Sequence, residues 1–84
     1  MIATPEYNGF VTPLLLNMLC WASRPSPGDD FGSVFQAKPV ALMAASPGRL
    51  GGVRVIPRLR DVLAKLGMIP VPGFVTVPAA ATAF

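Results

Sequence analysis

The sequence predicts an α/β fold built on a parallel sheet. Residues 40–45 form an uninterrupted apolar run between turn-forming residues, as expected of a strand that helices cover on both faces. On either side of it, in residues 13–23 and 53–66, apolar residues recur at spacings of three and four, which predicts two helices. Strands that alternate with helices favour parallel pairing through right-handed connections.

The first element is the end of a strand at residues 1–3, followed by a loop at residues 4–9. This loop is rich in turn formers, and Pro5 excludes a regular helix there. Pro13 suits the first turn of the helix that follows, at residues 13–23.

The predicted helix at residues 13–23 is apolar nearly all round. Only Asn17 and Cys20 interrupt its apolar surface, so we expect it to be buried on more than one side. Trp21 is then expected in the core or in a subunit interface rather than against a ligand. Cys20 is interpreted as a small buried hydrophobe without a redox role.

Residues 24–32 are a loop by composition, because they contain two prolines, two glycines and adjacent aspartates. The strand at residues 40–45 comes next; a helical segment could give the same apolar run, but six residues are too few for one. A glycine-rich loop at residues 46–52 then leads into the helix at residues 53–66. In that helix one stripe is apolar, formed by Ile56, Leu59, Val62, Leu63 and Leu66.

Gly67 is expected to end this helix, since glycine readily adopts the left-handed conformation found there. Residues 68–77 are predicted as the last strand. Pro70, Pro72 and Gly73 interrupt it, so it should be kinked or lie at a sheet edge.

The composition indicates an incomplete domain. Of the 84 residues, 52% are hydrophobic and 13% charged, against roughly 25% charged in a usual soluble domain. A chain this short buries only part of its surface, and two and a half strands do not complete a sheet with helices on both faces. We therefore expect residues 1–84 to be part of one domain whose apolar surface another segment covers.

The charged residues and the cysteine content exclude several classes of site. The net charge is +3, and five of the seven cations lie between Arg49 and Lys65. A solvated helix face explains that cluster better than binding to nucleic acid or an anionic membrane. One cysteine and no histidine exclude disulfide frameworks, zinc clusters and histidine-based triads in this sequence. We expect a cytoplasmic protein with no signal peptide and no membrane span.

Two loops are expected at one edge of the sheet. Residues 4–10 and 46–52 each follow a strand and precede a helix, and ligands of open α/β sheets bind at that edge. Loops rich in glycine and proline let backbone N–H groups approach a flat or anionic ligand. The second loop matches neither a Walker A sequence nor a G-x-G-x-x-G fingerprint, so a plain tight turn explains it equally well.

The order of motifs resembles a known family. Thr4-Pro5-Glu6-Tyr7-Asn8-Gly9 is similar to the flavin-contacting loop of the NAD(P)H-dependent FMN reductases, a flavodoxin-like family that includes quinone, chromate and azo-dye reductases. The similarity covers essentially the whole chain. It continues through Leu15, Asn17, Trp21, Ala22, Ser23, Arg24, Lys38-Pro39-Val40-Ala41, Ala45-Ser46-Pro47-Gly48, Gly51-Gly52, Arg54, Pro57, Leu59, Arg60, Pro78-Ala79-Ala80 and Phe84.

The resemblance implies a doubly wound parallel sheet and a flavoprotein. In such a protein NAD(P)H reduces bound FMN by hydride transfer, and the flavin then reduces a quinone or similar acceptor. It also implies a homo-oligomer, and neither nucleic acid nor membrane as partner. No catalytic side chain is expected. The residues expected to lie along the flavin ring, mostly through backbone groups, or to flank it, are Pro5, Glu6, Tyr7, Asn8, Gly9, Ser46, Pro47 and Gly48. Tyr7 and Asn8 could also be plain turn residues.

The sequence departs from the family pattern in three places. Phe10 replaces a small hydroxyl residue at the end of the flavin loop, and Leu16 replaces a lysine. The family's first strand and its phosphate-binding loop have no counterpart, and Met1 falls inside its third strand. We therefore expect the C-terminal half of a flavodoxin-like domain that is inactive alone. The alternative is a non-enzymatic remnant that oligomerises or binds a partner through the helix at residues 14–22.

Overall fold

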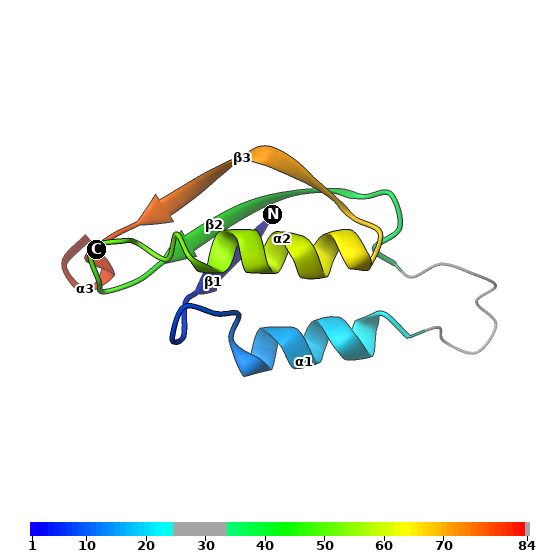
Figure 1. Cartoon of the computed structure of the whole chain (residues 1–84), viewed down its shortest axis with the longest axis horizontal. Coiled ribbons are helices and arrows are strands. Elements are labelled where there is room, and N and C mark those ends of the chain that lie inside the picture. Colours follow the sequence, from blue (N-terminus) through cyan, green and yellow to red (C-terminus); the bar gives the residue numbers. More distant parts are fainter. Residues whose placement is uncertain (25–33, 84) are drawn as a thin grey trace.

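The computed structural model describes residues 1–24 and 34–83, and most of the expected loop at residues 24–32 lies outside them. Three parallel strands form one sheet in the order β1-β2-β3, as Figure 1 shows. The parallel α/β class is therefore confirmed. The elements, in chain order, are β1 (Ile2–Pro5), α1 (Pro13–Ala22), β2 (Pro39–Ala45), α2 (Val55–Lys65), β3 (Ile69–Val77) and the short α3 (Ala80–Ala83).

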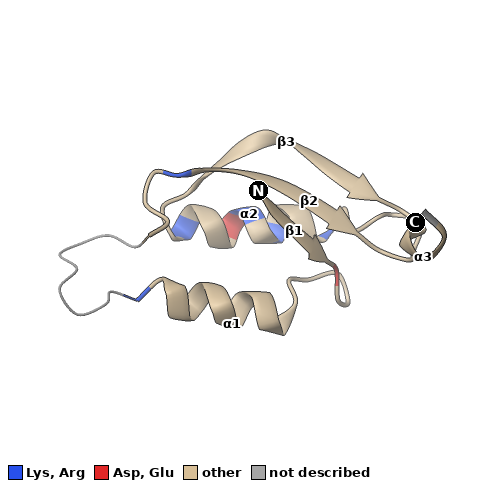
Figure 2. Cartoon of the chain, turned by 180° about the vertical axis from the view of Figure 1, so that it is seen from behind, with Lys and Arg blue, Asp and Glu red and all other residues tan. Residues whose placement is uncertain are grey.

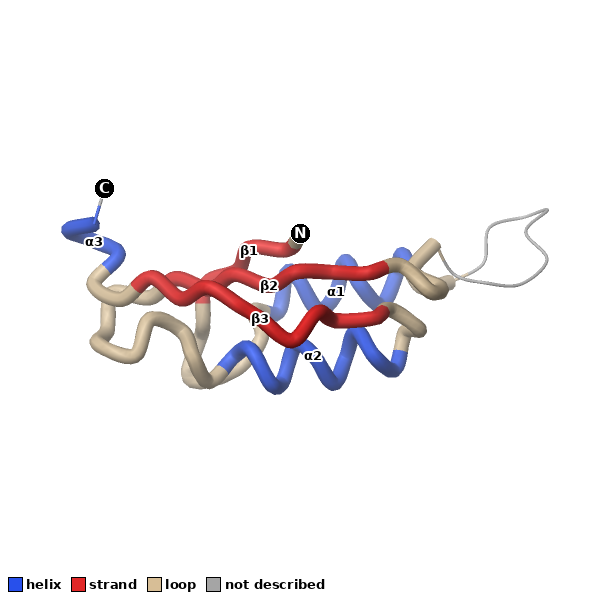
Figure 3. Tube along the Cα trace, turned by 90° about the horizontal axis from the view of Figure 1, so that it is seen from above, coloured by secondary structure: helices blue, strands red, loops and turns tan. Residues whose placement is uncertain are grey.

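Both long helices pack on the same face of the sheet, because one buried core joins Leu19 of α1, Leu42 of β2 and Leu59 of α2. Figure 3 shows α2 running along that side of the strands. Along β2, alternate side chains are buried beneath them, whereas Ala41, Met43 and Ala45 are only half-buried. The expectation that β2 is covered on both faces was therefore wrong for the described residues, because apolar composition does not reveal which covering elements are present. The fully buried core joins β2 to the apolar stripe of α2, and its largest members are Leu42, Val55, Ile56, Leu59 and Leu63.

Local signals set the helix ends. The side chain of Thr12 caps α1 by accepting a hydrogen bond from the Leu15 backbone N–H at 3.2 Å, and Pro13 occupies the first turn. Gly67 follows α2 with a φ of 97°, as expected for a glycine that ends a helix. The helix begins at Val55, two residues later than predicted.

Strand β3 is kinked and lies at an edge of this sheet, which confirms the prediction. Val40 pairs with Pro70, but Leu42 pairs with Phe74, so β3 has two more residues than β2 over this stretch and forms a bulge there. The bulge leaves carbonyl groups without partners in the strand ladder. Arg60 of α2 supplies the missing donor, because its Nη2 donates to the carbonyl oxygens of Val71 and Pro72. Its guanidinium also lies over the ring of Phe74, 5.2 Å from the centroid.

Helix α1 differs from expectation. Leu19 is its one buried residue, whereas Leu14, Met18 and Trp21 are 73%, 61% and 75% exposed. Cys20 is exposed as well. The predictions of burial on more than one side and of a buried Cys20 were therefore wrong, since the rest of the described fold covers α1 from one side only (Figure 1). Within the described residues, no helix has the length and hydropathy needed to cross a bilayer.

Candidate functional site

Two loops leave the sheet side by side. Pro5 at the end of β1 is the register partner of Ala45 at the end of β2, so the segments that follow them begin at the same edge. The Ser46 backbone N–H also donates to the Val77 carbonyl at 3.1 Å, which ties the second loop to the end of β3. This confirms that the loops at residues 4–10 and 46–52 meet at the carboxyl edge of the sheet, where α/β proteins bind ligands.

The first loop is a tight hairpin. The backbone groups of Tyr7 and Phe10 exchange two hydrogen bonds, of 3.1 and 3.0 Å. Between them, Asn8 and Gly9 have φ values of 54° and 75°, the positive pair that a type I′ turn requires. Asn-Gly suits this turn, since asparagine and glycine tolerate positive φ. The side chains of Tyr7 and Asn8 are exposed at its tip.

Glu6 joins the first loop to α2. Its Oε1 accepts a hydrogen bond from the Val55 backbone N–H at 2.9 Å. Arg54, at the N-cap position of α2, makes no capping bond with its own side chain. A carboxylate is favourable at the positive end of a helix, so Glu6 caps α2 from 49 residues away in the chain. The sequence pattern did not reveal this role.

The second loop is a turn held by its own groups. Gly48 donates its backbone N–H to the Ser46 side-chain oxygen at 3.2 Å, and the Gly48 carbonyl accepts from Ala79 N–H at 3.0 Å. Pro47 has no N–H to offer. The glycines at positions 51 and 52 have another function: a Cβ on Gly52 would lie 2.8 Å from the Ala44 Cβ. They let the chain pass close beneath the sheet, which favours the tight-turn interpretation of this segment.

An open cavity of about 370 Å³ lies between the two loops. Among the predicted site residues, Glu6, Ser46 and Gly48 line it, and Pro47 belongs to the same turn. Three further lining residues, which the sequence analysis did not assign to the site, are Arg49, Leu50 and Arg54. The available signal was that the two arginines flank the Gly51-Gly52 pair.

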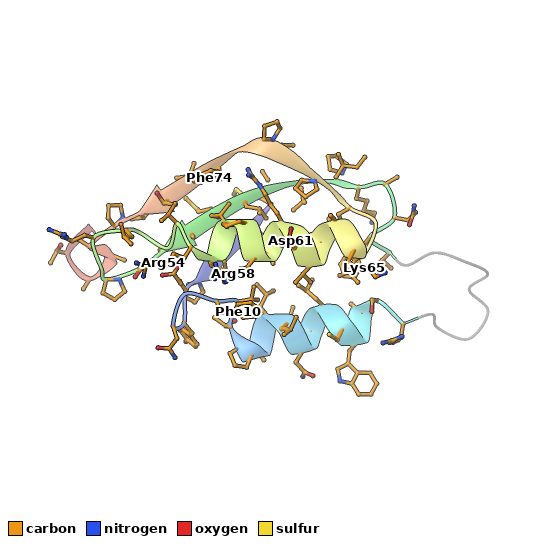
Figure 4. The ribbon with its side chains drawn as sticks, viewed as in Figure 1. Phe10, Arg54, Arg58, Asp61, Lys65 and Phe74 are labelled. Atoms are coloured by element: carbon orange, nitrogen blue, oxygen red, sulfur yellow. The ribbon has the colours of Figure 1, made fainter. Side chains whose placement is uncertain are left out.

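The remaining predicted residues lie beside this cavity rather than in its lining. The hairpin at residues 7–10 adjoins it, since a Cβ on Gly9 would lie 3.6 Å from Cδ of Arg54. Figure 4 shows Arg54 next to this hairpin. Pro5 instead lines a separate hollow of about 280 Å³ on the uncovered sheet face, together with Met43 and Val77. The structure thus brings most of the predicted residues together but separates Pro5 from Glu6.

The model of the NADPH-dependent FMN reductase family matches residues 1–82. The chain belongs to this family. Members of the NADPH-dependent FMN reductase family have a flavodoxin-like fold, and the three parallel strands with their helices fit that class.

Two curated relatives resemble the chain over 70 residues, each with 40% identity. One is an NAD(P)H-dependent FMN reductase of Pseudomonas aeruginosa; the match covers 83% of this chain and 35% of that protein. The other is a 2-hydroxy-1,4-benzoquinone reductase of Burkholderia sp, with 82% of this chain and 36% of the relative covered. The chain therefore spans about a third of the length of these relatives.

Proposed function

We propose that this chain provides the ring-binding edge of an NAD(P)H-dependent FMN oxidoreductase. The observation that supports this most directly is the cavity between the two loops, in a chain of the FMN reductase family. When bound, FMN would supply the redox chemistry, taking a hydride from NAD(P)H for transfer to an acceptor. Overall, NAD(P)H, a quinone and one proton would give NAD(P)⁺ and the hydroquinone. The exposed free thiol of Cys20 suits a reducing cytoplasm, which we include in the proposal.

The described residues fit a flat ring. The cavity is open, and Gly48 contributes backbone with no side chain to it. Leu50, at 49% exposure, offers an apolar surface, while Glu6, Arg49 and Arg54 provide a polar rim. Ligand sites commonly combine apolar contact with a few placed polar groups in this way.

The residues of the site would bind and orient the flavin rather than react with it. The hydrogen bond from Val55 N–H to Glu6 holds the first loop against α2, and the Tyr7–Phe10 hairpin fixes the backbone that would lie beside the ring. The sequence contains no histidine, and hydride transfer between two cofactors needs no side-chain nucleophile. We therefore assign the loops to orienting the flavin and not to acid–base catalysis.

A substitution that fills the cavity tests this proposal. Gly48 lines the cavity, and a Cβ there would meet the Ser46 Oγ at 3.6 Å, an ordinary contact, so Gly48→Leu should add bulk at the cavity wall without a local clash. A Cβ on Gly73 would meet nothing within 4 Å, so Gly73→Leu is the matched control. In titrations followed by flavin fluorescence, we expect saturable FMN binding by the parent chain and Gly73→Leu, and loss of at least about tenfold in affinity for Gly48→Leu. Equal affinities in all three, or no binding by the parent chain, would refute the proposal.

One observation favours self-association as a second function. The exposed residues Leu14, Met18 and Trp21 recur at helical spacing and form an apolar stripe along α1. Such stripes commonly mark interaction surfaces, and this one supports the homo-oligomer that the family resemblance implies. Sedimentation of the parent chain and of Trp21→Ser tests it. We expect concentration-dependent association that Trp21→Ser weakens; an unchanged monomer at every concentration would contradict it.

A further inference from the structure

The hairpin at residues 7–10 is attached to α2 at both of its ends. Just before it, Glu6 accepts the Val55 N–H at 2.9 Å. At its other end, the guanidinium group of Arg58 lies over the Phe10 ring, with 6.0 Å between the guanidinium carbon and the ring centroid. Figure 4 shows Phe10 next to Arg58. A carboxylate on one side and an aromatic ring on the other thus join the hairpin to α2.

The guanidinium group of Arg58 is itself held in place. Its Nη1 donates to the backbone carbonyl of Arg54 at 3.2 Å, one turn earlier in α2. Figure 2 shows that basic residues run along α2, with an acidic residue among them. The contacts of these basic residues differ, since Arg60 donates to the bulge of β3 whereas Arg58 reaches the hairpin. Arg58 is therefore distinguished from the general positive charge of this helix by a specific aromatic partner.

Burial does not fix the position of Phe10. Its side chain is 44% exposed, whereas the next residue, Val11, belongs to the buried core. Two backbone hydrogen bonds join Phe10 to Tyr7, but they hold the hairpin together without fixing its direction. That direction depends on the contacts between the hairpin and α2. The small hydroxyl residue of the family pattern at this position would offer Arg58 no ring to contact.

We propose that Arg58 is a positioning residue which, through the Phe10 ring, holds the Tyr7–Phe10 hairpin in place for contact with the flavin ring. The inference rests on the proposed function, which puts the backbone of this hairpin beside the ring. A cation over an exposed aromatic ring contributes modestly, so the contact adjusts the hairpin rather than the whole fold. Its benefit to binding is pre-organisation, because a hairpin already held in its bound position loses less conformational freedom when the ligand binds.

Flavin affinity in a set of matched variants tests the inference. Phe10→Leu removes the ring but keeps an apolar side chain, Phe10→Tyr keeps the ring, and Arg58→Gln removes the cation. The control, Lys65→Gln, removes the same charge at the far end of α2 (Figure 4). In fluorescence titrations with FMN and with riboflavin, we expect Phe10→Leu and Arg58→Gln to weaken the binding of both ligands by about three- to fivefold. Phe10→Tyr and Lys65→Gln should bind both ligands as the parent chain does.

The double variant shows whether the two residues act together. If Arg58 acts through Phe10, the chain carrying both Phe10→Leu and Arg58→Gln binds flavin no more weakly than either single variant. Losses that multiply in the double variant, an Arg58→Gln variant that binds like the parent chain, or an equal loss in Lys65→Gln would each overturn the inference. A Phe10→Tyr variant as weak as Phe10→Leu would also overturn it, because the guanidinium group contacts the ring and Phe10→Tyr retains that ring.

A second measurement does not depend on flavin binding. NMR relaxation of the ¹⁵N-labelled, flavin-free chain gives the order parameters of the Asn8 and Gly9 backbone amides. We expect values typical of rigid backbone, about 0.85, in the parent chain, Phe10→Tyr and Lys65→Gln, and values falling toward about 0.6 in Phe10→Leu and Arg58→Gln. Unchanged values in Arg58→Gln would overturn the inference. Lower values there, with no FMN binding by the parent chain, would refute the proposed function alone, so the failures of the two proposals are distinguishable.

Discussion

Removing the carboxylate of Glu6 should destabilise the whole fold, although Glu6 lies in a loop. Its Oε1 accepts the Val55 backbone N–H at 2.9 Å, and no side-chain cap from Arg54 replaces that bond. Without Glu6, the Val55 N–H keeps only its 3.2 Å bond to the Gly52 carbonyl, at a point where Val55 and Ile56 are buried. The first loop also loses a tether to the helix.

The size of the effect follows from the geometry. A helix N-terminus is equivalent to about half a unit charge, so a carboxylate 2.9 Å away gains between about 0.7 kcal/mol in bulk water and about 2.9 kcal/mol at an effective dielectric constant of about 20. Glu6 is half-buried, which places it between these limits. We expect Glu6→Ala to lower the free energy of unfolding by about 2 kcal/mol, and Glu6→Gln, which keeps a neutral acceptor, by about 1 kcal/mol.

Urea unfolding followed by circular dichroism measures these differences. Asp61→Asn is the matched control, because Asp61 is an exposed acidic residue on α2 itself and should change stability by less than about 0.5 kcal/mol. The expected order of stability is parent chain, Glu6→Gln, then Glu6→Ala. If both Glu6 variants unfold with the parent chain, or if Asp61→Asn is as damaging as Glu6→Ala, the capping argument is refuted.

Three further substitutions probe the loops and the bulge. Gly52→Ala should lower the free energy of unfolding, measured by thermal unfolding, by about 2–4 kcal/mol, because φ at this position is 87° and the new Cβ would overlap that of Ala44. The control Gly73→Ala should be nearly neutral, and equal effects of the two substitutions would refute the packing argument. In the same assay, Asn8→Gly should change the free energy of unfolding by less than about 0.5 kcal/mol, whereas Asn8→Ala should lower it by about 1 kcal/mol, because alanine adopts a φ of 54° less readily than asparagine or glycine. If Asn8→Ala had no effect, the positive-φ turn would be excluded. Arg60→Lys should lower the free energy of unfolding in urea by about 1–2 kcal/mol, because one ammonium group cannot contact two carbonyl oxygens and the Phe74 ring at once. A variant as stable as the parent chain would show that the bulge does not depend on the guanidinium group.

The site could be predicted in part from the sequence. Strand, loop and helix order was enough to place Glu6 and Ser46 at one edge, because parallel strands joined by helices bring their carboxyl ends together. The hairpin was foreseeable as a turn from Asn8-Gly9. The capping bond of Glu6 was not, since its partner Val55 is 49 residues away and nothing local marks the pairing.

The sequence by itself determined the order of the elements, the parallel sheet, the apolar stripe of α2 and the kink in β3. All of these follow from local periodicity and from the backbone limits of proline and glycine. Only the tertiary structure decided which apolar surfaces are covered and which polar groups are partnered. Trp21 and Leu59 are both apolar residues on predicted helices, yet one is 75% exposed and the other fully buried. Arg54 and Arg60 are likewise the same residue type on one segment, yet one lines the cavity and the other holds the bulge. Whether a side chain is buried or hydrogen-bonded depends on which elements pack against it in the fold, and residue type and periodicity do not contain that information.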